Sequence, residues 1–367
     1  MKIVYLYDSL AIWGGIERVL IDKMNYFADI YGYDVYIITA SQGNHELPYS
    51  LNPQIHHIDT DIRIHLRYKY KGIKRLIVAY KQDKLYSKRL SQLLDDIKPN
   101  ILVSTTNQDL KALVKIKKDI PLVVESHSNF IHQDSFHNKI KKIFNNWWAR
   151  KADAIVTLTE GDANNWRMIA NNVHVIPNIV HINKTGKYSN CTAKRALFVG
   201  RFERQKGLNY LFDIWKRVHA LHRDWHLDMF GDGDLGDYYK KISEELDINI
   251  NVNKPTSDIF KEYINSSMLL LTSIYEPFGL VIPEAMSCGI PVVAFDCPYG
   301  PASIIKDNMN GKIIDLYDIT KFVEVVDELI NNQSKLVTIG KQAVSDIKQF
   351  DEANVMPNWI RLFVNLN

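Results

Sequence analysis

The sequence predicts an α/β protein with two doubly wound, Rossmann-like domains that face each other across a cleft. The first observation is length, because 367 residues are enough for two domains of roughly 150 to 200 residues each. The second is that short apolar runs such as "ILVSTT" and "PVVAF" alternate with helical stretches through both halves. Runs that are rich in Val and Ile and apolar throughout are typical of strands buried on both faces of a parallel sheet.

The expected strands can be placed in chain order. In the first half they lie near residues 2–8, 33–40, 55–59, 100–105, 120–125, 153–159 and 173–176. In the second half they lie near 195–200, 225–230, 248–252, 267–273, 290–295 and 311–314. Residues 1–185 are predicted to form an amino-terminal domain and 186–349 a carboxy-terminal one, with the polar stretch 183–194 as the linker. The end of the chain, about 350–367, is expected to be a helix that packs back on the first domain.

The composition excludes several protein classes. The chain is 46% hydrophobic and 24% charged, which is ordinary for a soluble globular protein. Cys191, Cys288 and Cys297 fit neither a disulfide framework nor a CxxC zinc site, and they indicate a reducing compartment. The sequence opens directly into a strand-like run without a signal-peptide pattern, and no apolar run approaches the roughly 18 residues of a membrane span. These observations predict a cytoplasmic protein.

Basic residues are concentrated in one segment of the first half. Residues 1–185 hold 25 Lys and Arg against 18 Asp and Glu, whereas 186–367 hold 20 against 24. Within 63–90, ten basic residues and interleaved Tyr, Leu and Ile face one acid, Asp83, and 139–150 adds lysines and two tryptophans. We expect peripheral binding to an anionic membrane surface; the alternative is a solvated basic helix face. No recognition motif accompanies the charge, so nucleic acid is not an expected partner.

Two strand ends of the first half carry candidate ligand-binding residues, because open α/β sheets bind ligands beyond the carboxyl ends of their strands. Gly14 and Gly15 follow the first strand and precede a helix, where a phosphate or sugar could approach backbone amides. A plain tight turn explains them equally well. Glu125 and His127 follow another apolar strand. His127 is a candidate to contact a substrate hydroxyl, and a capping or packed histidine is the alternative.

Two cations follow the strand predicted near 195–200. Arg201 and Lys206 stand five positions apart across a loop and have the charge to clamp a diphosphate. The Walker A pattern is absent, and for this segment taken alone a solvated loop is favoured over a clamp. Asp232 and Asp234 form a DxD sequence, for which a Gly/Asp turn is favoured over a metal site.

The stretch "SIYEPFGLVIPEAMSCGIPVV" holds two carboxylates eight positions apart, Glu276 and Glu284. Pro283 suits the first turn of a short helix and Gly289 its carboxy-terminal cap, so Glu276 is expected on a loop and Glu284 on the helix. The backbone amides at 279–281 would stay free near the helix start and favour an anion. Two acids flanking a phosphate cradle suit a nucleotide sugar, which has a hexose, a diphosphate and a ribose.

Together these motifs resemble retaining glycosyltransferases of family 4, which have the GT-B fold, over nearly the whole chain. The resemblance is carried by "GGIER" (14–18), "VIPNIV" (175–180), "VGRFERQKGL" (199–208), "FGDG" (230–233) and "EPFGLVIPEAMSCGIPVVA" (276–294). Ile179 and Val180 follow "IPN" where many members have Gly-Val or Gly-Ile. The stretch after Asp296 reads "CPYGPASII", a form that resembles a bacterial subset acting on surface polysaccharides.

The resemblance implies a role for each candidate residue. Arg201 and Lys206 would neutralise the diphosphate leaving group, Glu276 would bond the hydroxyls of the donor sugar and Glu284 those of the ribose. The remaining implied donor contacts are the amides from Phe278 through Gly279 and Leu280 to Val281, the close approach at Gly14 and Gly15, His127 near the reacting carbon, and Lys254 and Pro255 against the base. No metal and no cofactor is expected, because the cations and helix amides would stabilise the negative charge of the diphosphate.

The predicted function is transfer of a hexose or N-acetylhexosamine from a nucleotide diphosphate sugar, UDP being favoured, to a saccharide acceptor. A lipid-linked acceptor in surface polysaccharide synthesis is expected. Three alternatives remain. A dinucleotide oxidoreductase would need GxGxxG after the first strand, which is missing. A non-catalytic saccharide- or membrane-binding protein would not need the charged candidate residues Arg201, Lys206, Glu276 and Glu284. A GT-A transferase would need a DxD motif that binds a metal ion, whereas Asp232 and Asp234 favour a turn.

Overall fold

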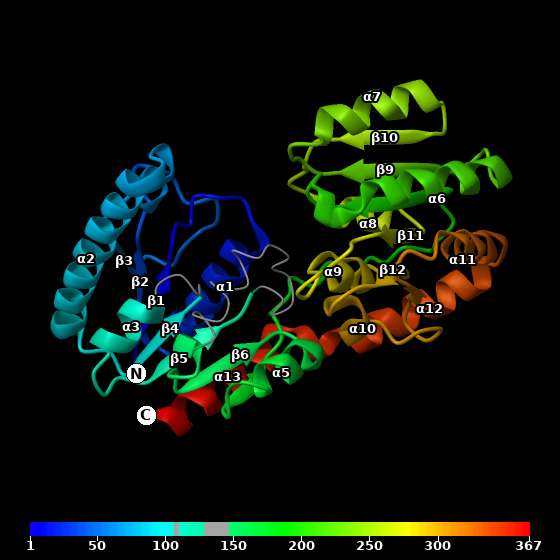
Figure 1. Cartoon of the computed structure of the whole chain (residues 1–367). Helices are drawn as coiled ribbons and strands as arrows, with labels where there is room; N and C mark the ends of the chain where they lie inside the picture. Colours follow the sequence, from blue (N-terminus) through cyan, green and yellow to red (C-terminus); the bar gives the residue numbers. More distant parts are fainter. Residues whose placement is uncertain (106–109, 128–146) are drawn as a thin grey trace. The chain divides into compact units, whose positions relative to one another are not determined.

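The computed structural model describes residues 1–105, 110–127 and 147–367. The chain divides into two compact units, Met1–Ile179 with Met356–Asn367, and Val180–Val355. Each unit is built on its own parallel sheet with helices packed against it (Figure 1). The fold class predicted from the sequence, two doubly wound α/β domains, is confirmed.

The first unit has a seven-stranded sheet in the order β3-β2-β1-β4-β5-β6-β7. Its strands are β1 (Lys2–Tyr7), β2 (Asp34–Thr39), β3 (His56–Asp59), β4 (Ile101–Ser104), β5 (Leu122–Glu125), β6 (Ala154–Thr157) and β7 (Val173–Val175). Among the described residues its helices are α1 (Gly15–Asp29), the 3-10 helix η1 (Ile64–Lys69), α2 (Gly72–Ile97), α3 (Leu110–Ile116) and α5 (Glu160–Arg167), and it also takes up most of α13 (Glu352–Leu366).

Alternate residues of β1 face the two helical layers of the first unit, as the period of two in a strand requires. Val4 and Leu6 belong to a cluster that includes Leu90 and Leu94 of α2. Tyr5 points to the other side, where it lies under Lys23 of α1. Both faces of the sheet are therefore buried, which explains why its strands read as continuous apolar runs.

The second unit has a six-stranded parallel sheet in the order β10-β9-β8-β11-β12-β13. Its strands are β8 (Arg195–Val199), β9 (His226–Phe230), β10 (Ile250–Asn253), β11 (Met268–Leu271), β12 (Val292–Asp296) and β13 (Lys312–Asp315). Its helices are η2 (Arg204–Lys206), α6 (Leu208–Leu221), α7 (Gly236–Leu246), α8 (Ile259–Ile264), α9 (Val281–Ser287), α10 (Gly300–Ile304), α11 (Ile319–Asn331), α12 (Gln333–Asp346) and η3 (Ile347–Phe350).

Both sheets follow the doubly wound order in which the chain starts in the middle, builds one edge and then crosses to the other side. In the first unit the order reverses between β1 and β4, and in the second between β8 and β11. The strands found in the structure match the thirteen that the sequence predicts, with ends shifted by one or two residues. This agreement follows from the burial of both sheet faces.

The polar stretch 183–194, expected to be a linker, belongs to the second unit. Its backbone is held on α9 and the turn that follows: the amide of Asn183 donates to Ser287 Oγ at 3.0 Å, and the amide of Ser189 donates to the carbonyl of Cys288 at 2.9 Å. Along the sequence, the boundary between the two units lies earlier, between Ile179 and Val180. Short polar segments carry no periodicity whether or not their backbone is fixed, so the sequence does not reveal these bonds.

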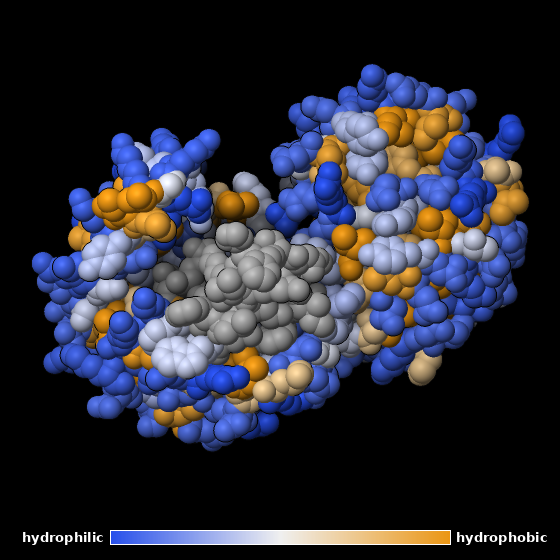
Figure 2. Space-filling model, in the orientation of Figure 1, coloured by the Kyte–Doolittle hydropathy of each residue, from blue (hydrophilic) through white to orange (hydrophobic). Residues whose placement is uncertain are grey.

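The surface drawn in Figure 2 is mostly hydrophilic, with separate hydrophobic areas over both units. Among the residues that the structure describes, no helix combines the length and the hydropathy needed to cross a bilayer.

Candidate functional site

The switch in strand order of the second unit brings two loops together. At such a point, the helices that follow two neighbouring strands lie on opposite faces of the sheet. The loops at the carboxyl ends of those two strands therefore form the usual ligand site of an open α/β sheet. The loop after β8 carries Arg201 and Lys206, and the loop after β11 carries Glu276. The two loops are bonded to each other, since the amide of Ile274 donates to the carbonyl of Gln205 at 2.9 Å.

Lys206 and Glu276 form an ion pair between these loops. Lys206 Nζ donates to Glu276 Oε1, and Ser273 Oγ donates to the same oxygen at 2.8 Å. Glu276 is 4% exposed, so its charge would be costly without a partner. The structure therefore brings together a cation and a carboxylate that sequence analysis assigns to one ligand site, although they are 70 positions apart.

The backbone of Glu276 is fixed by the segment that departs from the usual family pattern. Its amide donates to the carbonyl of Pro298 at 2.9 Å, and its carbonyl accepts from the amides of Tyr299 and Gly300 at 2.9 and 2.8 Å. A Cβ atom at Gly300 would lie 2.2 Å from the carbonyl oxygen of Phe278. The "CPYGPASII" stretch thus supports the loop that carries Glu276, and its glycine permits the close approach.

Gly207→Ala is expected to destabilise the second unit. Gly207 has φ +59°, and a Cβ there would lie 2.1 Å from the carbonyl oxygen of Thr272, so the loop carrying Lys206 would have to move. We expect a loss of about 1–3 kcal/mol in the free energy of unfolding, measured by urea titration. Gly186→Ala is the matched control, because Gly186 has φ +71° with nothing within 4 Å. Equal losses in the two variants would contradict the steric argument.

Glu284 lies on α9, and Glu276 lies on the loop before that helix. Glu284 is 3% exposed, and Tyr263 OH lies 3.3 Å from its Oε2 atom in hydrogen-bonding geometry. Within the described residues, the amides of Gly279, Leu280 and Val281 donate no hydrogen bond. Two acids and a run of available amides therefore occupy one short segment. Tyr263 is a contact that sequence reasoning missed, because nothing in the motif points to α8.

Of the other predicted residues of the second unit, Phe278 is buried, whereas Arg201, Lys254 and Pro255 are on the surface. The Arg201 side chain is 64% exposed, and its NH1 atom lies 3.0 Å from Glu203 Oε1. Lys254 and Pro255 are exposed and directly follow β10. The amide of Gly231, after β9, donates to the carbonyl of Asn253 at 3.2 Å, so these strand ends lie next to each other. The structure shows no direct contact of Arg201, Lys254 or Pro255 with the Lys206–Glu276 pair.

In the first unit, Gly14 and Gly15 form the start of α1. Gly14 is the N-cap residue without a side-chain cap, and Tyr7 OH donates to Glu17 Oε1 at 2.8 Å in the first helical turn. A Cβ at Gly14 would lie 2.1 Å from Glu17 Oε2, so the glycine leaves room for this carboxylate. Burial, followed by the negative charge of Glu17, raises the pKa of Tyr7 well above its ordinary value. Trp13, next to the glycines, is 76% exposed.

His127 lies beside a buried ion pair that sequence analysis did not predict. Lys23 Nζ of α1 donates to Glu125 Oε1 at the end of β5, and both side chains are 1% exposed. His127 Nε2 lies 3.2 Å from the same oxygen without hydrogen-bonding geometry. Lys23 Nζ also lies 4.4 Å from the ring centroid of Trp359 on α13. The available signal was that Lys23 falls on the apolar face of its helix, one turn from Val19 and Phe27.

The charges of this cluster perturb one another. Burial alone would raise the pKa of Glu125, but the neighbouring Lys23 and His127 side chains outweigh it and lower the pKa to about 2. Burial lowers the pKa of Lys23, and Glu125 opposes that shift. Glu125 is therefore ionised at neutral pH, with a carboxylate next to the predicted sugar-contacting histidine.

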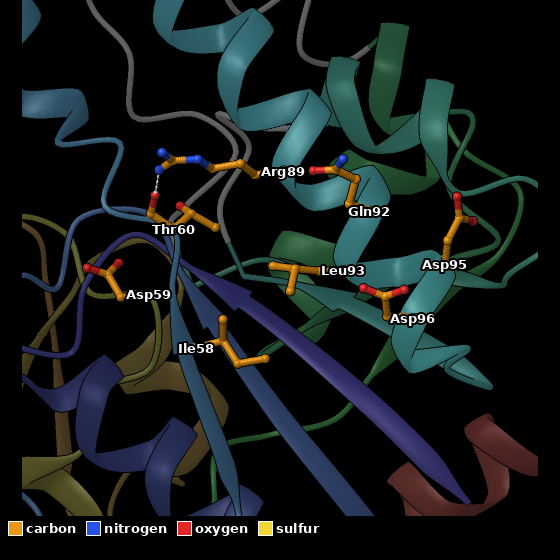
Figure 3. A pocket seen from close by; sticks show the side chains of 8 residues that line it. All are labelled: Ile58, Asp59, Thr60, Arg89, Gln92, Leu93, Asp95 and Asp96. Atoms are coloured by element: carbon orange, nitrogen blue, oxygen red, sulfur yellow. Dashed lines mark hydrogen bonds between the residues drawn. The ribbon is translucent and has the colours of Figure 1, made fainter.

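A hollow of about 550 Å³ on the first unit is distinct from these groups (Figure 3). Its lining residues are Ile58, Asp59, Thr60, Arg89, Gln92, Leu93, Asp95 and Asp96. Asp59 accepts bonds from the amides of Gln42 and Gly43, and Arg89 donates to the carbonyl of Thr60. Its charged groups thus hold loops in place, and none of the predicted site residues lines it.

The DxD sequence is part of a turn. Gly233 has φ +147°, a Cβ there would lie 2.8 Å from the carbonyl oxygen of Phe202, and its amide donates to Asp232 Oδ1 at 2.8 Å. These features agree with the turn interpretation. In the part of the chain that the structure describes, no group of three or more His, Cys, Asp or Glu side chains is arranged to hold a metal ion.

Comparison with known proteins adds independent evidence. A family model described as glycosyltransferase family 4 matches residues 13–184, and one described as glycosyl transferases group 1 matches residues 181–346. An uncharacterized glycosyltransferase of Haemophilus influenzae is 27% identical over 98% of both chains. The amylovoran biosynthesis glycosyltransferase AmsD of Erwinia amylovora is 28% identical over 57% of this chain and 61% of its own.

A solved structure has the same fold. It is a variant of Staphylococcus aureus TarM in complex with fondaparinux, α-GlcNAc-glycerol and UDP, with a TM-score of 0.82 at 16% identity over 99% of each chain. Together, fold, motifs and relatives define a glycosyltransferase with the GT-B fold. The chain belongs to the family 4 and group 1 glycosyltransferases and is related to enzymes of polysaccharide biosynthesis.

Proposed function

We propose that this glycosyltransferase moves a hexose or N-acetylhexosamine from a UDP-sugar to a saccharide acceptor. The observation that carries the proposal is the Lys206–Glu276 ion pair at the strand-order switch of the second unit. It lies in the segment that also holds Glu284 and the available amides of 279–281. UDP is favoured because it is bound in the TarM complex, a protein of the same fold.

Each group has a proposed role that suits its charge. Lys206, with Arg201, neutralises the diphosphate, and the amides from Phe278 to Val281 add partial positive charge. Glu276 accepts bonds from hydroxyls of the donor sugar, and Glu284 accepts bonds from the ribose. In this structure Lys206 and Glu276 neutralise each other. The two loops thus keep the charges adjacent, which suits a ligand that carries a diphosphate for Lys206 and sugar hydroxyls for Glu276.

The remaining predicted contacts complete the donor site as proposals. The base lies against the backbone near Lys254 and Pro255, at the end of β10. Gly14 and Gly15 permit approach of the diphosphate or the acceptor, and His127 contacts the sugar near the reacting carbon. The buried Glu125 supports that role, because it places a negative charge 3.2 Å from the His127 ring nitrogen Nε2.

Charge development determines the proposed mechanism. Breaking the bond between sugar and phosphate leaves an oxocarbenium-like sugar and a diphosphate with additional negative charge. Lys206 stabilises that charge more strongly in the transition state than in the bound donor, which lowers the barrier. We propose retention of anomeric configuration by attack on the same face, with the leaving phosphate accepting the proton of the acceptor hydroxyl. No metal is required, because the cations and amides supply the positive charge.

The proposed acceptor is a lipid-linked saccharide in bacterial capsule, O-antigen or related surface polysaccharide synthesis. The relation to the amylovoran enzyme supports the saccharide class. Such an acceptor places the enzyme in the cytoplasm, at the inner face of the cell membrane.

A thermal-shift screen tests the donor assignment. We expect UDP and one UDP-sugar to raise the melting temperature, since a ligand at 100 times its Kd stabilises the folded state by about 2.7 kcal/mol. GDP, its sugars and NAD are the comparison set, and the stabilising donor is then tested for transfer with and without a chelator. Stabilisation by NAD alone, or no transfer or hydrolysis with any nucleotide sugar, would contradict the proposal. Loss of transfer in the chelator would contradict metal independence.

A further inference from the structure

The first turns of α2 present an apolar stripe to solvent. Ile73, Leu76, Ile77 and Tyr80 are 77%, 69%, 50% and 68% exposed. Their spacing of i, i+3, i+4 and i+7 places all four on one face of the helix. Figure 2 shows the corresponding hydrophobic area over the first turns of α2, with hydrophilic residues around it. Four large apolar side chains exposed on one face are unusual for a surface that only meets water.

This stripe is not an extension of the face that packs on the first unit. The second half of α2 buries Tyr86, Leu90, Leu94 and Ile97. At 100° per residue, the exposed stripe is rotated by roughly 90° from that buried face. The sheet beneath α2 therefore does not explain the apolar residues at its start.

Basic residues border the stripe. Lys74, Lys81 and Lys88 are exposed and lie along one edge of the stripe. Lys84 lies on the same face as the stripe, one helical turn after Tyr80. Asp83, the acid of this segment, lies 2.7 Å from Arg67 NH2, so its charge is already paired. Apolar side chains bordered on one edge by lysines form a surface that matches a partner with both a hydrophobic phase and negative charge.

We propose that the first half of α2 docks on the surface of an anionic lipid bilayer, with Ile73, Leu76, Ile77 and Tyr80 in the interfacial region and the lysines against the headgroups. An amphipathic helix with this composition lies in the plane of the interface, and both apolar burial and charge contribute to binding. The docking deepens the proposed function, since a lipid-linked acceptor would lie in the same bilayer. Sequence analysis also expects the basic and aromatic segment 139–150 to contribute to membrane binding. Residues 139–146 of that segment lie outside the described residues.

Vesicle co-sedimentation of the full chain tests this surface. The probes are vesicles of phosphatidylcholine alone and of phosphatidylcholine mixed with phosphatidylglycerol. We expect binding to the mixed vesicles, weakened by added salt, and little binding to the neutral ones. Equal binding to both vesicle types, or to neither, would overturn the proposal.

Three variants separate the two contributions. Lys81→Gln/Lys84→Gln should lower the partition coefficient on anionic vesicles roughly thirtyfold, because both charges lie close to the headgroups. Leu76→Ser/Ile77→Ser should lower it on the same vesicles through loss of apolar burial. Lys240→Gln/Lys241→Gln on α7 removes the same charge from exposed positions of the second unit and should leave binding unchanged. A loss of the same size in this control would overturn the assignment to α2.

Two further readouts distinguish this inference from its alternatives and from the proposed function. If the stripe is an interface between copies of the chain, analytical ultracentrifugation will show an oligomer that Leu76→Ser/Ile77→Ser dissociates, and that result overturns bilayer docking. Donor hydrolysis in solution, without vesicles, should be the same in all variants. Failure of vesicle binding with intact hydrolysis would refute the docking surface alone, whereas absent hydrolysis with intact vesicle binding would refute the proposed function alone.

Discussion

Replacing Lys206 with alanine is expected to lower turnover by about 100- to 1,000-fold or more, because it removes a preorganised cation from the departing diphosphate. The cation is held in place by Glu276 and by the 3-10 helix η2, so its effect does not depend on a mobile side chain. The measurement is kcat for transfer, or for donor hydrolysis, with the nucleotide sugar that the thermal-shift screen selects.

A neighbouring residue provides the matched control for Lys206→Ala. Arg204 is an exposed cation two positions earlier in the same 3-10 helix, and Arg204→Ala should change turnover by no more than about twofold, within the usual small effect of a surface substitution. Because Lys206→Ala leaves Glu276 buried without its cation, a melting curve must show that the variant is folded at the assay temperature. Near-normal turnover in a folded Lys206→Ala protein would refute the clamp assignment.

Lys23→Met is expected to destabilise the first unit by about 3–5 kcal/mol, because it leaves Glu125 charged and buried without its partner. That loss is a large part of the roughly 5–15 kcal/mol that stabilises a typical domain. The double variant Lys23→Met/Glu125→Gln should recover most of it, since both charges are then gone. Lys118→Met, which breaks an exposed pair with Asp95 in the same unit, should cost less than about 1 kcal/mol. Urea titration measures all three, and a double variant no better than Lys23→Met would contradict this account.

The same pair gives a pH dependence with a definite sign. The pKa of Glu125 is about 2 in the folded chain against an ordinary value of 4.5. A carboxyl whose folded pKa is lowered contributes stability above its unfolded pKa and loses that contribution as the pH falls toward the folded one. Stability should therefore decline between pH 4.5 and about 2, and the decline should be smaller in Lys23→Met/Glu125→Gln. Identical acid profiles in the two proteins would show that Glu125 is not the group responsible.

The strands were predictable because both sheets are buried on two faces, so each strand is a short apolar run bounded by polar residues. The placement of Glu276 on a loop and Glu284 on the helix was also predictable, since Pro283 and Gly289 define the helix between them. Gly289 has φ +80° directly after α9, as a helix-terminating glycine does.

Other features were beyond the sequence because they depend on which strands are neighbours. The pairing of Lys206 with Glu276 requires β11 to lie beside β8, and no local pattern specifies that order. The Lys23–Glu125 pair likewise joins α1 to β5 across 102 positions. The hydrogen bonds that join the polar stretch 183–194 to α9 and to the turn after it likewise leave no trace in composition.

The first unit is discontinuous in sequence, since residues 356–367 join it after the whole second unit has intervened. On the ribosome, Lys23 is therefore synthesised long before Trp359, whose ring lies over its ammonium group, and before Phe363, which packs on Phe27. A nascent chain holding only the first 179 residues lacks the α13 side chains that contact Lys23 and Phe27. The core of the first unit is consequently completed only after the whole second unit and residues 356–367 have been synthesised.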